Sequence, residues 1–325
     1  MRAAYIDEFG PAASIRFGEL PDPRPGAGDV LVDVEVTTAN HVDTFIRSGA
    51  VATPVDFPFV VGRDLVGRVA ALGERVTGFE PGQRVWCNSL GHGGRQGAAA
   101  ERAVVPAERL YPLPDGVDPA AAVALLHPAA TAHLGLVTHG GLRAGATVVV
   151  IGAAGNVGAA MVAVAAGAGA RVVAVARERD TAYCRALGAD VVVDRTSGDI
   201  GAALARACPD GVDLYADAAG VNDLATAVGL LARRGRIVLL AGLHTRPVLP
   251  AGPLYVQDRS VVGFAITGAP AAELAEAAHR VNGLLTEGRL RPRQVRTLPL
   301  SATAEAHRML EAGELRGTRV VLTAR

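Results

Sequence analysis

A glycine-rich turn in the middle of the chain has the residue types and spacing that bind a dinucleotide. The β-branched run Thr147–Ile151 has the length of a strand, and the turn begins directly after it. Gly155 lets the backbone approach a pyrophosphate, and Gly158 lets the following helix lie close to the strand. The N-terminus of that helix offers free N–H groups to the anion. A tight turn in any parallel α/β domain is the alternative, but the flanking strands favour a cofactor site. The predicted contacts are Gly152, Ala153, Ala154, Gly155, Asn156, Val157 and Gly158.

The end of the second strand indicates which nicotinamide cofactor is preferred. Sites for NAD usually carry an acidic residue there, which bonds the ribose 2′-hydroxyl. Here the strand Arg171–Ala176 is followed by Arg177, whose guanidinium is suited to pair with a 2′-phosphate through two parallel bonds. In the alternative, Arg177 and Arg179 are solvated charges at a helix start, and Glu178 turns toward the ribose. We predict NADPH rather than NADH.

Further cofactor contacts are expected from the loops after the later strands. In open parallel sheets, ligands collect at the carboxyl ends of the strands. Small residues there allow backbone groups to contact the cofactor. The alternative is that they are ordinary loop residues. The predicted contacts are Ala219 and Gly220 after the fourth strand, Ala241, Gly242 and Leu243 after the fifth, and Phe264, Ala265 and Ile266 after the sixth.

These residues need a parallel sheet to hold them, and the pattern of the chain predicts one. The first third contains short apolar segments separated by Gly and Pro, which is typical of a β-rich domain. From about residue 119 a helix to 139 and then alternating strands and helices follow, including a helix over 222–233. We expect an α/β protein with a β-rich domain over 1–120, completed by 268–325, and a cofactor domain over 121–267.

Composition excludes several classes of function. The 32 basic and 32 acidic side chains cancel, and aromatic residues make up 4%, which argues against nucleic-acid binding. The three cysteines lie far apart and form no CxxC pair, so they predict neither a disulfide framework nor a thiolate zinc site. The N-terminus has no apolar signal segment, and the alanine-rich runs are broken by Gly, Pro and His. We expect a cytoplasmic protein that binds no membrane.

Four segments carry a resemblance that covers nearly the whole chain. They are NHVDTFIRSG at 40–49, PFVVGRDLVG at 58–67, FEPGQRV at 79–85 and LGAD at 187–190, and the glycine turn adds to them. With these motifs the chain resembles the medium-chain dehydrogenase/reductase superfamily, in its zinc-independent quinone oxidoreductase (zeta-crystallin-like) branch. The resemblance implies a GroES-like N-terminal domain and a Rossmann cofactor domain.

The resemblance also bears on metal. Zinc-dependent relatives place a Cys, a His with an adjacent Glu, and a further Cys or Asp at their metal site. The matching positions here hold Asn40, Arg63 with Asp64, and His127. A catalytic zinc needs about three protein ligands, so we expect no metal. Without zinc to polarise a carbonyl, reduction of quinones or activated alkenes is favoured over alcohol oxidation.

The candidate catalytic residues come from the same comparison of motifs. Asn40 and Asp43 match residues that lie near the nicotinamide, and Asn40 is suited to bond an acceptor oxygen or the cofactor. As an exposed carboxylate, Asp43 is expected to be ionised and to orient its loop. Phe45 stands where relatives often have Tyr, which leaves proton delivery to water or to a histidine such as His127. Thr131 resembles the residue that faces the nicotinamide ribose and diphosphate.

We therefore expect an NADPH-dependent reductase of a small electrophilic acceptor, a quinone or an α,β-unsaturated carbonyl compound. The alternatives are an enoyl-thioester reductase and a protein that binds NADPH without turnover. The apolar stretch 259–266 predicts an edge strand that pairs across a two-fold axis, and hence a homodimer.

Overall fold

The chain folds into two compact units. The computed structural model describes residues 1–196 and 198–324. The first unit contains residues 1–127 and 274–325, and the second contains residues 128–273. The domain boundaries expected from the sequence, at 120 and 267, lie a few residues before the observed ones at 127 and 273. Both observed breaks lie inside helices, α3 (Leu126–His133) and α9 (Ala271–Thr286).

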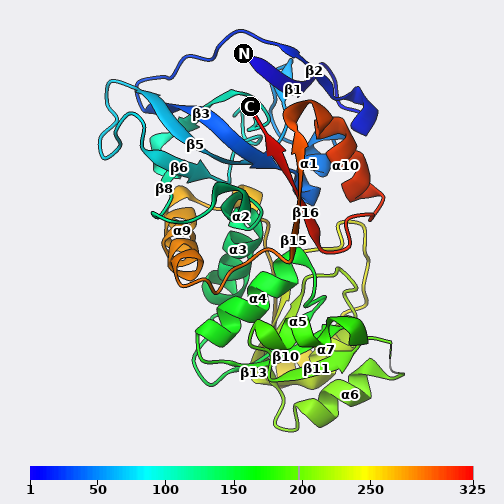
Figure 1. Ribbon diagram of the computed structural model, residues 1–325. Helices are drawn as coiled ribbons and strands as arrows, with labels where there is room; N and C mark the ends of the chain where they lie inside the picture. Colours follow the sequence, from blue (N-terminus) through cyan, green and yellow to red (C-terminus); the bar gives the residue numbers. More distant parts are fainter. Residues whose placement is uncertain (197, 325) are drawn as a thin grey trace. The chain divides into compact units, whose positions relative to one another are not determined.

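The first unit is built on a mostly antiparallel sheet with the order β15-β16-β3-β5-β6-β8, and β7 also pairs with β3. A smaller sheet has the order β2-β1-β4. Figure 1 shows the long strands β3 and β5 side by side. The strands are β1 (Arg2–Ile6), β2 (Arg16–Glu19), β3 (Asp29–Thr38), β4 (Phe59–Val60), β5 (Asp64–Leu72), β6 (Arg84–Cys87), β7 (Arg102–Pro106), β8 (Tyr111–Pro112), β15 (Gln294–Pro299) and β16 (Thr318–Thr323), and the helices are α1 (His41–Arg47), α2 (Pro119–Val123), α9 and α10 (Thr303–Glu311).

Alternating side chains on β3 explain where this strand lies. Val30, Val32 and Val34 are buried, whereas the residues between them are half-buried, so one face of the strand lies on the core. The last strand, β16, returns from the end of the chain and pairs antiparallel with the end of β3, Val321 opposite Thr38. The first unit therefore needs both ends of the chain.

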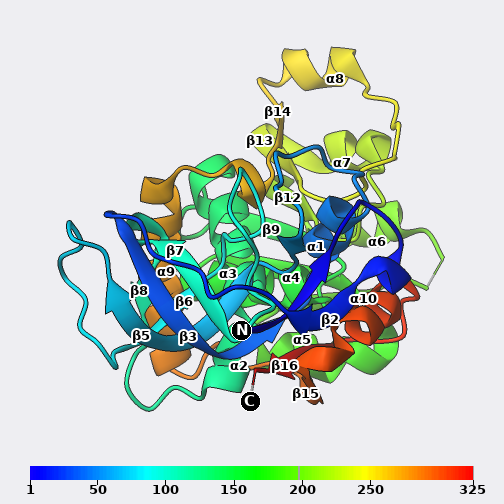
Figure 2. The ribbon, with the colours of Figure 1, turned by 90° about the horizontal axis from the view of Figure 1, so that it is seen from above.

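The second unit is a parallel sheet with the strand order β11-β10-β9-β12-β13-β14. Part of this order, from β14 through β13 and β12 to β9, can be followed in Figure 2. The direction of the order changes at β9, which is where open sheets bind ligands. The elements are β9 (Thr147–Ile151), α4 (Asn156–Gly167), β10 (Arg171–Ala176), α5 (Thr181–Ala186), β11 (Val191–Asp194), α6 (Ile200–Ala207), β12 (Val212–Asp217), α7 (Leu224–Leu230), β13 (Leu231–Leu239), α8 (Ala251–Val256) and β14 (Ser260–Gly263).

Several expected elements differ from the observed ones. The helix expected over 119–139 is divided into α2, α3 and a π-helical end, Leu134–His139. Pro128 explains the first break, since it lacks an N–H and its ring would collide with the carbonyl four residues earlier. The helix expected over 222–233 is shorter, because Leu231 already has extended backbone angles and begins β13. Helix α8 and strand β15 were not predicted.

Among the described residues, no helix is both long and apolar enough to cross a membrane.

Candidate functional site

The glycine turn of the second unit forms a close junction between β9 and α4. Gly152 ends β9 with φ +74°, a left-handed backbone conformation that favours glycine. A Cβ at Gly158 would lie 2.1 Å from the Gly152 carbonyl oxygen, so only glycine lets α4 approach the strand this closely. Gly155 is the N-cap of α4, and no side chain in the described chain caps this helix start. Its first N–H groups are therefore available to an anion.

The loop after β12 is held by one buried carboxylate. Asp217 accepts N–H groups from Ala219 at 2.8 Å, Gly220 at 2.9 Å and Asn222 at 2.5 Å. Three such bonds fix the loop backbone. The same loop touches the glycine turn, because a Cβ at Gly152 would lie 3.0 Å from the Ala219 Cβ.

Asn222 connects this loop to the loop after β13. Its side-chain amide donates to the Ala241 carbonyl at 3.0 Å and to the Thr245 hydroxyl at 2.7 Å. Its backbone has φ +54°, an uncommon conformation that asparagine tolerates better than most residues. Gly220 approaches the same loop, since a Cβ there would lie 2.6 Å from the Gly242 nitrogen. The loops after β9, β12 and β13 thus meet at one edge of the sheet.

The other residues predicted to bind the cofactor have different surroundings. Arg177 is exposed at the end of β10, and Leu243 is exposed in the loop after β13. Phe264 stacks on His139, with ring centroids 4.7 Å apart, and its ring lies against Gly135. Thr131 on α3 is buried, and its hydroxyl has no hydrogen-bond partner in the described part of the chain. Of the neighbours of Phe264, Ala265 is exposed and Ile266 is buried.

The candidate catalytic residues of the first unit belong to a buried polar cluster, which we define as Asn40, Asp43, Arg63, Asp64, His127 and Arg319. Arg319 on β16 donates to the Asn40 side-chain oxygen at 2.8 Å, and the Asn40 amide donates to Asp64 at 3.1 Å. The Asn40 backbone N–H donates to Asp43 at 2.7 Å. Asn40 is therefore engaged at both ends of its side chain, which leaves one amide hydrogen for an acceptor or a cofactor.

The charges in this cluster are two carboxylates and two guanidiniums, all buried. Burial raises the pKa of Asp43 to about 7, and the nearby Arg63 guanidinium opposes that rise. Burial also raises the pKa of Asp64 to about 6, again against the effect of Arg63. The expectation that Asp43 is an exposed, fully ionised carboxylate is wrong, because α1 packs this side chain into the domain. Its expected role in orienting the loop agrees with its bond to the Asn40 N–H.

His127 and Phe45 differ in what they offer to proton transfer. Burial, together with the Arg63 and Arg319 guanidiniums, lowers the pKa of His127 well below its usual range. A neutral imidazole at pH 7 holds no transferable imidazolium proton, which argues against His127 as the acid. Its Nδ1 has no hydrogen-bond partner among the described residues. Phe45 lies half-buried on α1 and has no proton to give.

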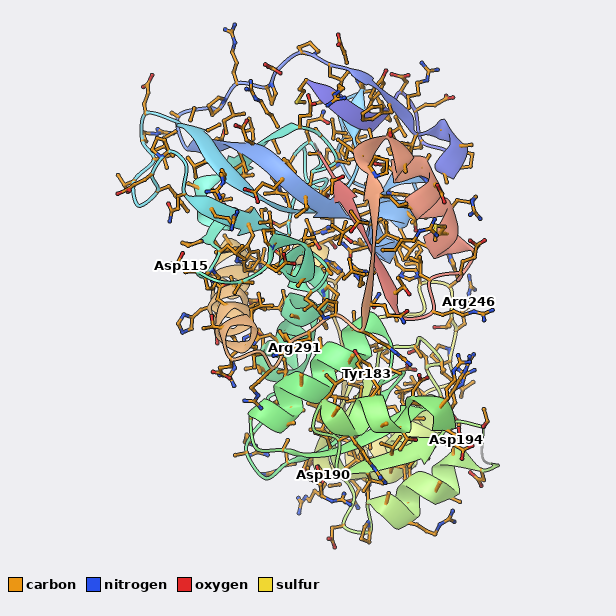
Figure 3. The ribbon with its side chains drawn as sticks, in the orientation of Figure 1. Asp115, Tyr183, Asp190, Asp194, Arg246 and Arg291 are labelled. Carbon is orange, nitrogen blue, oxygen red and sulfur yellow. The ribbon has the colours of Figure 1, made fainter. Side chains whose placement is uncertain are left out.

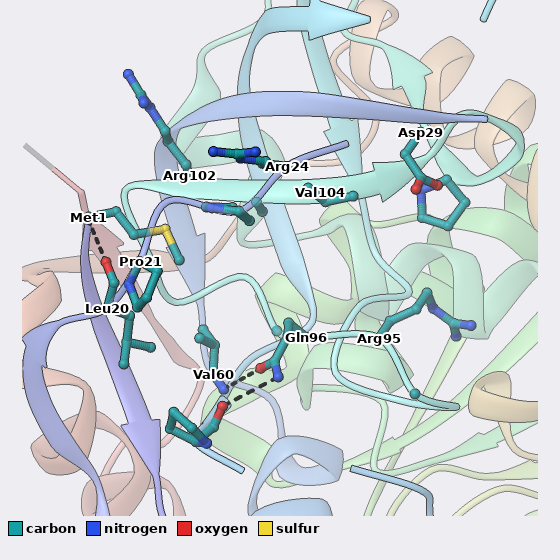
Figure 4. A pocket seen from close by; sticks show the side chains of 16 residues that line it. Met1, Leu20, Pro21, Arg24, Asp29, Val60, Arg95, Gln96, Arg102 and Val104 are labelled. Atoms are coloured by element: carbon teal, nitrogen blue, oxygen red, sulfur yellow. Dashed lines mark hydrogen bonds between the residues drawn. The ribbon is translucent and has the colours of Figure 1, made fainter. Parts of the chain in front are cut away.

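A cavity of about 440 Å³ in the first unit lies apart from these residues (Figure 4). Met1, Pro21, Arg24 and Val104 are among the residues that line it, and none of the residues in the polar cluster does. At one wall the Gln96 side-chain oxygen accepts the Val60 N–H at 2.7 Å. The cavity is therefore not the candidate site.

Two family models match the chain. The model described as "Alcohol dehydrogenase GroES-like domain" matches residues 26–115, and the model described as "Zinc-binding dehydrogenase" matches residues 156–282. They confirm the expected fold class, an α/β protein with a β-rich GroES-like N-terminal domain and a Rossmann-like parallel sheet.

Full-length relatives and solved structures agree with these matches. Quinone oxidoreductase of Mus musculus is 27% identical over 99% of this chain and 97% of its own length. "Quinone oxidoreductase-like protein 2 homolog" of Nematostella vectensis is 30% identical over 81% of this chain and 72% of its own length. The solved structure of mycobacterial Rv1454c complexed with NADPH is 27% identical, with a TM-score of 0.84 over 99% of this chain and all of that one. An NAD-dependent alcohol dehydrogenase structure is 30% identical, with a TM-score of 0.87 over 99% of both chains.

The name of one matched model implies zinc, but the residues of the polar cluster do not fit a zinc ion. A structural or catalytic zinc takes Cys, His or carboxylate ligands. Here a buried guanidinium, Arg63, stands in the cluster, and Asn40 and Asp64 bond each other. No group of three or more His, Cys, Asp or Glu side chains suited to a metal occurs in the described ranges.

Proposed function

Because this chain belongs to the medium-chain dehydrogenase/reductase superfamily, in its quinone oxidoreductase branch, we propose that it is an NADPH-dependent oxidoreductase that reduces a quinone or an α,β-unsaturated carbonyl compound without zinc. The observation that carries the proposal is the meeting of three strand-end loops around the uncapped start of α4. A dinucleotide pyrophosphate needs a backbone that it can approach closely and free N–H groups that bind it.

The residues of the second unit divide the work of holding the cofactor. The turn 152–158 binds the pyrophosphate, and Asp217 and Asn222 keep the neighbouring loops in place. Arg177 pairs with the 2′-phosphate, which favours NADPH. A bound nicotinamide supplies the hydride, so the protein needs only to position the acceptor, exclude water and manage the proton.

The polar cluster of the first unit supplies electrostatics in place of a metal. Arg63 and Arg319 are permanent positive charges that stabilise Asp43 and Asp64 in their buried positions. Asn40, held by Arg319 and Asp64, presents its remaining amide hydrogen in one fixed orientation. With no phenol at Phe45 and a neutral His127, we propose that the proton comes from water.

The test compares acceptors, cofactors and metal in one assay. We expect the purified chain to oxidise NADPH with 1,4-benzoquinone, followed by loss of the reduced nicotinamide absorbance, and to keep its rate after treatment with a zinc chelator. Turnover of crotonyl-CoA in preference to quinones would instead support an enoyl-thioester reductase. Tight NADPH binding with no turnover of any acceptor would support a binding protein. Zinc-dependent oxidation of alcohols would overturn the proposal.

The proposal includes a cytoplasmic homodimer. Strand β14 lies at one edge of the six-stranded sheet, with β11 at the other, and edge strands offer unpaired backbone groups to a second copy. Helix α8 precedes β14 in the sequence, and its side chains Tyr255 and Val256 are 74% and 63% exposed. Large apolar side chains exposed in one chain are often covered by a second copy in an assembly. Light scattering coupled to gel filtration tests the dimer.

A further inference from the structure

Two arginines lie opposite each other at the carboxyl ends of neighbouring strands in the second unit. Strands β10 and β11 are parallel, and their register ends with Ala176 opposite Asp194. The Arg195 N–H donates to the Ala176 carbonyl at 2.7 Å, which extends the pairing by one step. Arg177 keeps extended backbone angles, φ −78° and ψ 151°, so it follows in register with Arg195. Residues in register on parallel strands place their side chains on the same face.

Neither guanidinium forms an ion pair within 4.0 Å in the described part of the chain, although the charge of Arg195 acts weakly on the adjacent Asp194 carboxylate. Arg177 and Arg195 are both exposed, and no ion pair or side-chain hydrogen bond joins either one to another residue in the chain as described. Asp194, labelled in Figure 3, is the last residue of β11 and directly precedes Arg195 in the sequence. The Asp194 carboxylate accepts the Thr196 N–H at 3.0 Å and the Thr196 hydroxyl at 2.8 Å.

Hydrogen bonds, more than the Arg195 charge, therefore stabilise the Asp194 carboxylate. The N–H and hydroxyl of Thr196 are the largest causes of its lowered pKa, whereas the charge of Arg195 is the smallest. Like charges placed opposite each other on paired strands destabilise the pair. Two arginines without an ion-pair partner in the described ranges, placed at the carboxyl ends of neighbouring parallel strands, are suited to hold an anion between or beside their side chains.

The chemistry of the chain narrows the choice of that anion. The sequence contains no lysine, so arginine is the side chain that carries a permanent positive charge. Guanidinium groups bind phosphate through two parallel bonds, and a phosphate monoester carries about −1.5 to −2 charges at pH 7. Two guanidiniums match that charge. The end of the second strand is also where the adenosine ribose lies in dinucleotide-binding sheets.

We propose that Arg177 and Arg195 together bind the 2′-phosphate of NADPH, and that Arg195 is a specificity-determining residue. This inference rests on the proposed function, because it needs the cofactor to occupy this edge of the sheet. Arg177 follows the second strand, where sequence patterns look for specificity. Arg195 follows the third strand and reaches the same place only because the two strands pair in this register.

The test measures dissociation constants of NADPH and NADH for wild type, Arg195→Ala, Arg177→Ala and the double variant. We expect Arg195→Ala to weaken NADPH about tenfold or more, as loss of a charge-assisted bond predicts, and to leave NADH within about twofold. The matched control is Arg179→Ala, an exposed arginine in the same segment whose guanidinium lies 4.0 Å from Asp180. It should change neither constant. Wild-type NADPH affinity should fall with added salt, and the double variant should lose that dependence.

The outcomes separate this inference from the proposed function. A wild type that binds neither dinucleotide overturns both. A wild type that binds NADPH, with an Arg195→Ala variant that keeps the wild-type ratio of the two constants, overturns the arginine pair and leaves the proposed function standing. All of these side chains are exposed, and a melting curve for each variant identifies any loss of folding.

Discussion

Gly155 and Gly158 lie three residues apart in one turn, yet substituting each by alanine should damage a different property of the protein. A Cβ at Gly158 would lie 2.1 Å from the Gly152 oxygen and 2.7 Å from the Gly152 carbonyl carbon, and both are backbone atoms that cannot rotate away. A Cβ at Gly155 meets only the Gly152 oxygen, at 3.2 Å. We therefore expect Gly158→Ala to damage the fold and Gly155→Ala to damage cofactor binding.

The size of each effect follows from these distances. Ordinary contact begins at 3.4 Å, so α4 must move from the turn by about 1.3 Å to accept Gly158→Ala. Overpacking of this kind costs about 2 kcal/mol, which lowers the melting temperature by roughly 4–8 °C in a domain of this size. Gly155→Ala creates a much milder conflict, 3.2 Å instead of 2.1 Å, and should lower the melting temperature by less than Gly158→Ala does. Its methyl group obstructs the pyrophosphate and should weaken NADPH about tenfold or more, which is about 1.4 kcal/mol.

The assay combines thermal melting with NADPH titration on the same samples. Gly229→Ala is the matched control, since Gly229 lies inside α7 and a Cβ there meets nothing within 4 Å. This control should gain up to about 1 kcal/mol of stability and bind NADPH normally. Unchanged NADPH affinity in Gly155→Ala would refute the placement of the pyrophosphate. An unchanged melting temperature in Gly158→Ala would refute the contact between α4 and the turn.

Three further predictions concern the polar cluster and the loops. The pKa of Asp43 is raised to about 7, so the folded state holds this proton more tightly than the unfolded state does, and the stability that the proton contributes is lost as the pH rises from about 4 to 7. In chemical denaturation, Asp43→Asn should therefore gain stability relative to wild type over pH 5–7. Plots of unfolding free energy against pH that run parallel for the two proteins would contradict this. Arg319→Met removes a positive charge from beside Asp43 and Asp64 and should lower the free energy of unfolding by about 3–5 kcal/mol. Arg319→Lys should recover part of that loss. A loss below about 1 kcal/mol in urea unfolding of Arg319→Met would show that the cluster does not depend on this charge. Asn222→Gly relieves the strain of the left-handed backbone but removes the side-chain hydrogen bonds to Ala241 and Thr245. It should therefore raise the KM for NADPH several-fold and leave kcat at saturating cofactor nearly unchanged. A loss in kcat alone would argue against a role of Asn222 in placing the loops.

Local patterns in the sequence predicted the second unit well, for a physical reason. Strand β9, the glycine turn and α4 are each determined by neighbouring residues: β-branched side chains form the strand, and glycine is required where backbones touch. The break before α3 depends on Pro128, a local signal that periodicity alone overlooked. The short helix α8 has no strong amphipathic pattern to mark it, and β15 is exposed along most of its length.

The site was harder to predict, because its residues act through distant partners. Asp43 was expected to be exposed since most aspartates are, but packing of α1 buries it. Asn222 and Asp217 hold the loops through bonds to residues that only the folded sheet brings near. Arg195 looks like an ordinary surface residue in the sequence, and the role proposed for it depends on the register of β10 with β11. The assignment of each contact residue to the cofactor stays a prediction.

The position of β16 also has a consequence for the synthesis of the chain. Residues 128–273 are continuous, so the second unit can form as soon as they leave the ribosome. The first unit must wait, because β16 pairs with β3 and the Thr38 hydroxyl bonds the Val320 carbonyl across 282 residues. Until β16 has been synthesised, part of one edge of β3 has no strand beside it, and such edges promote aggregation. Nascent chains should therefore depend on chaperones at the β-rich end, although that end is made first.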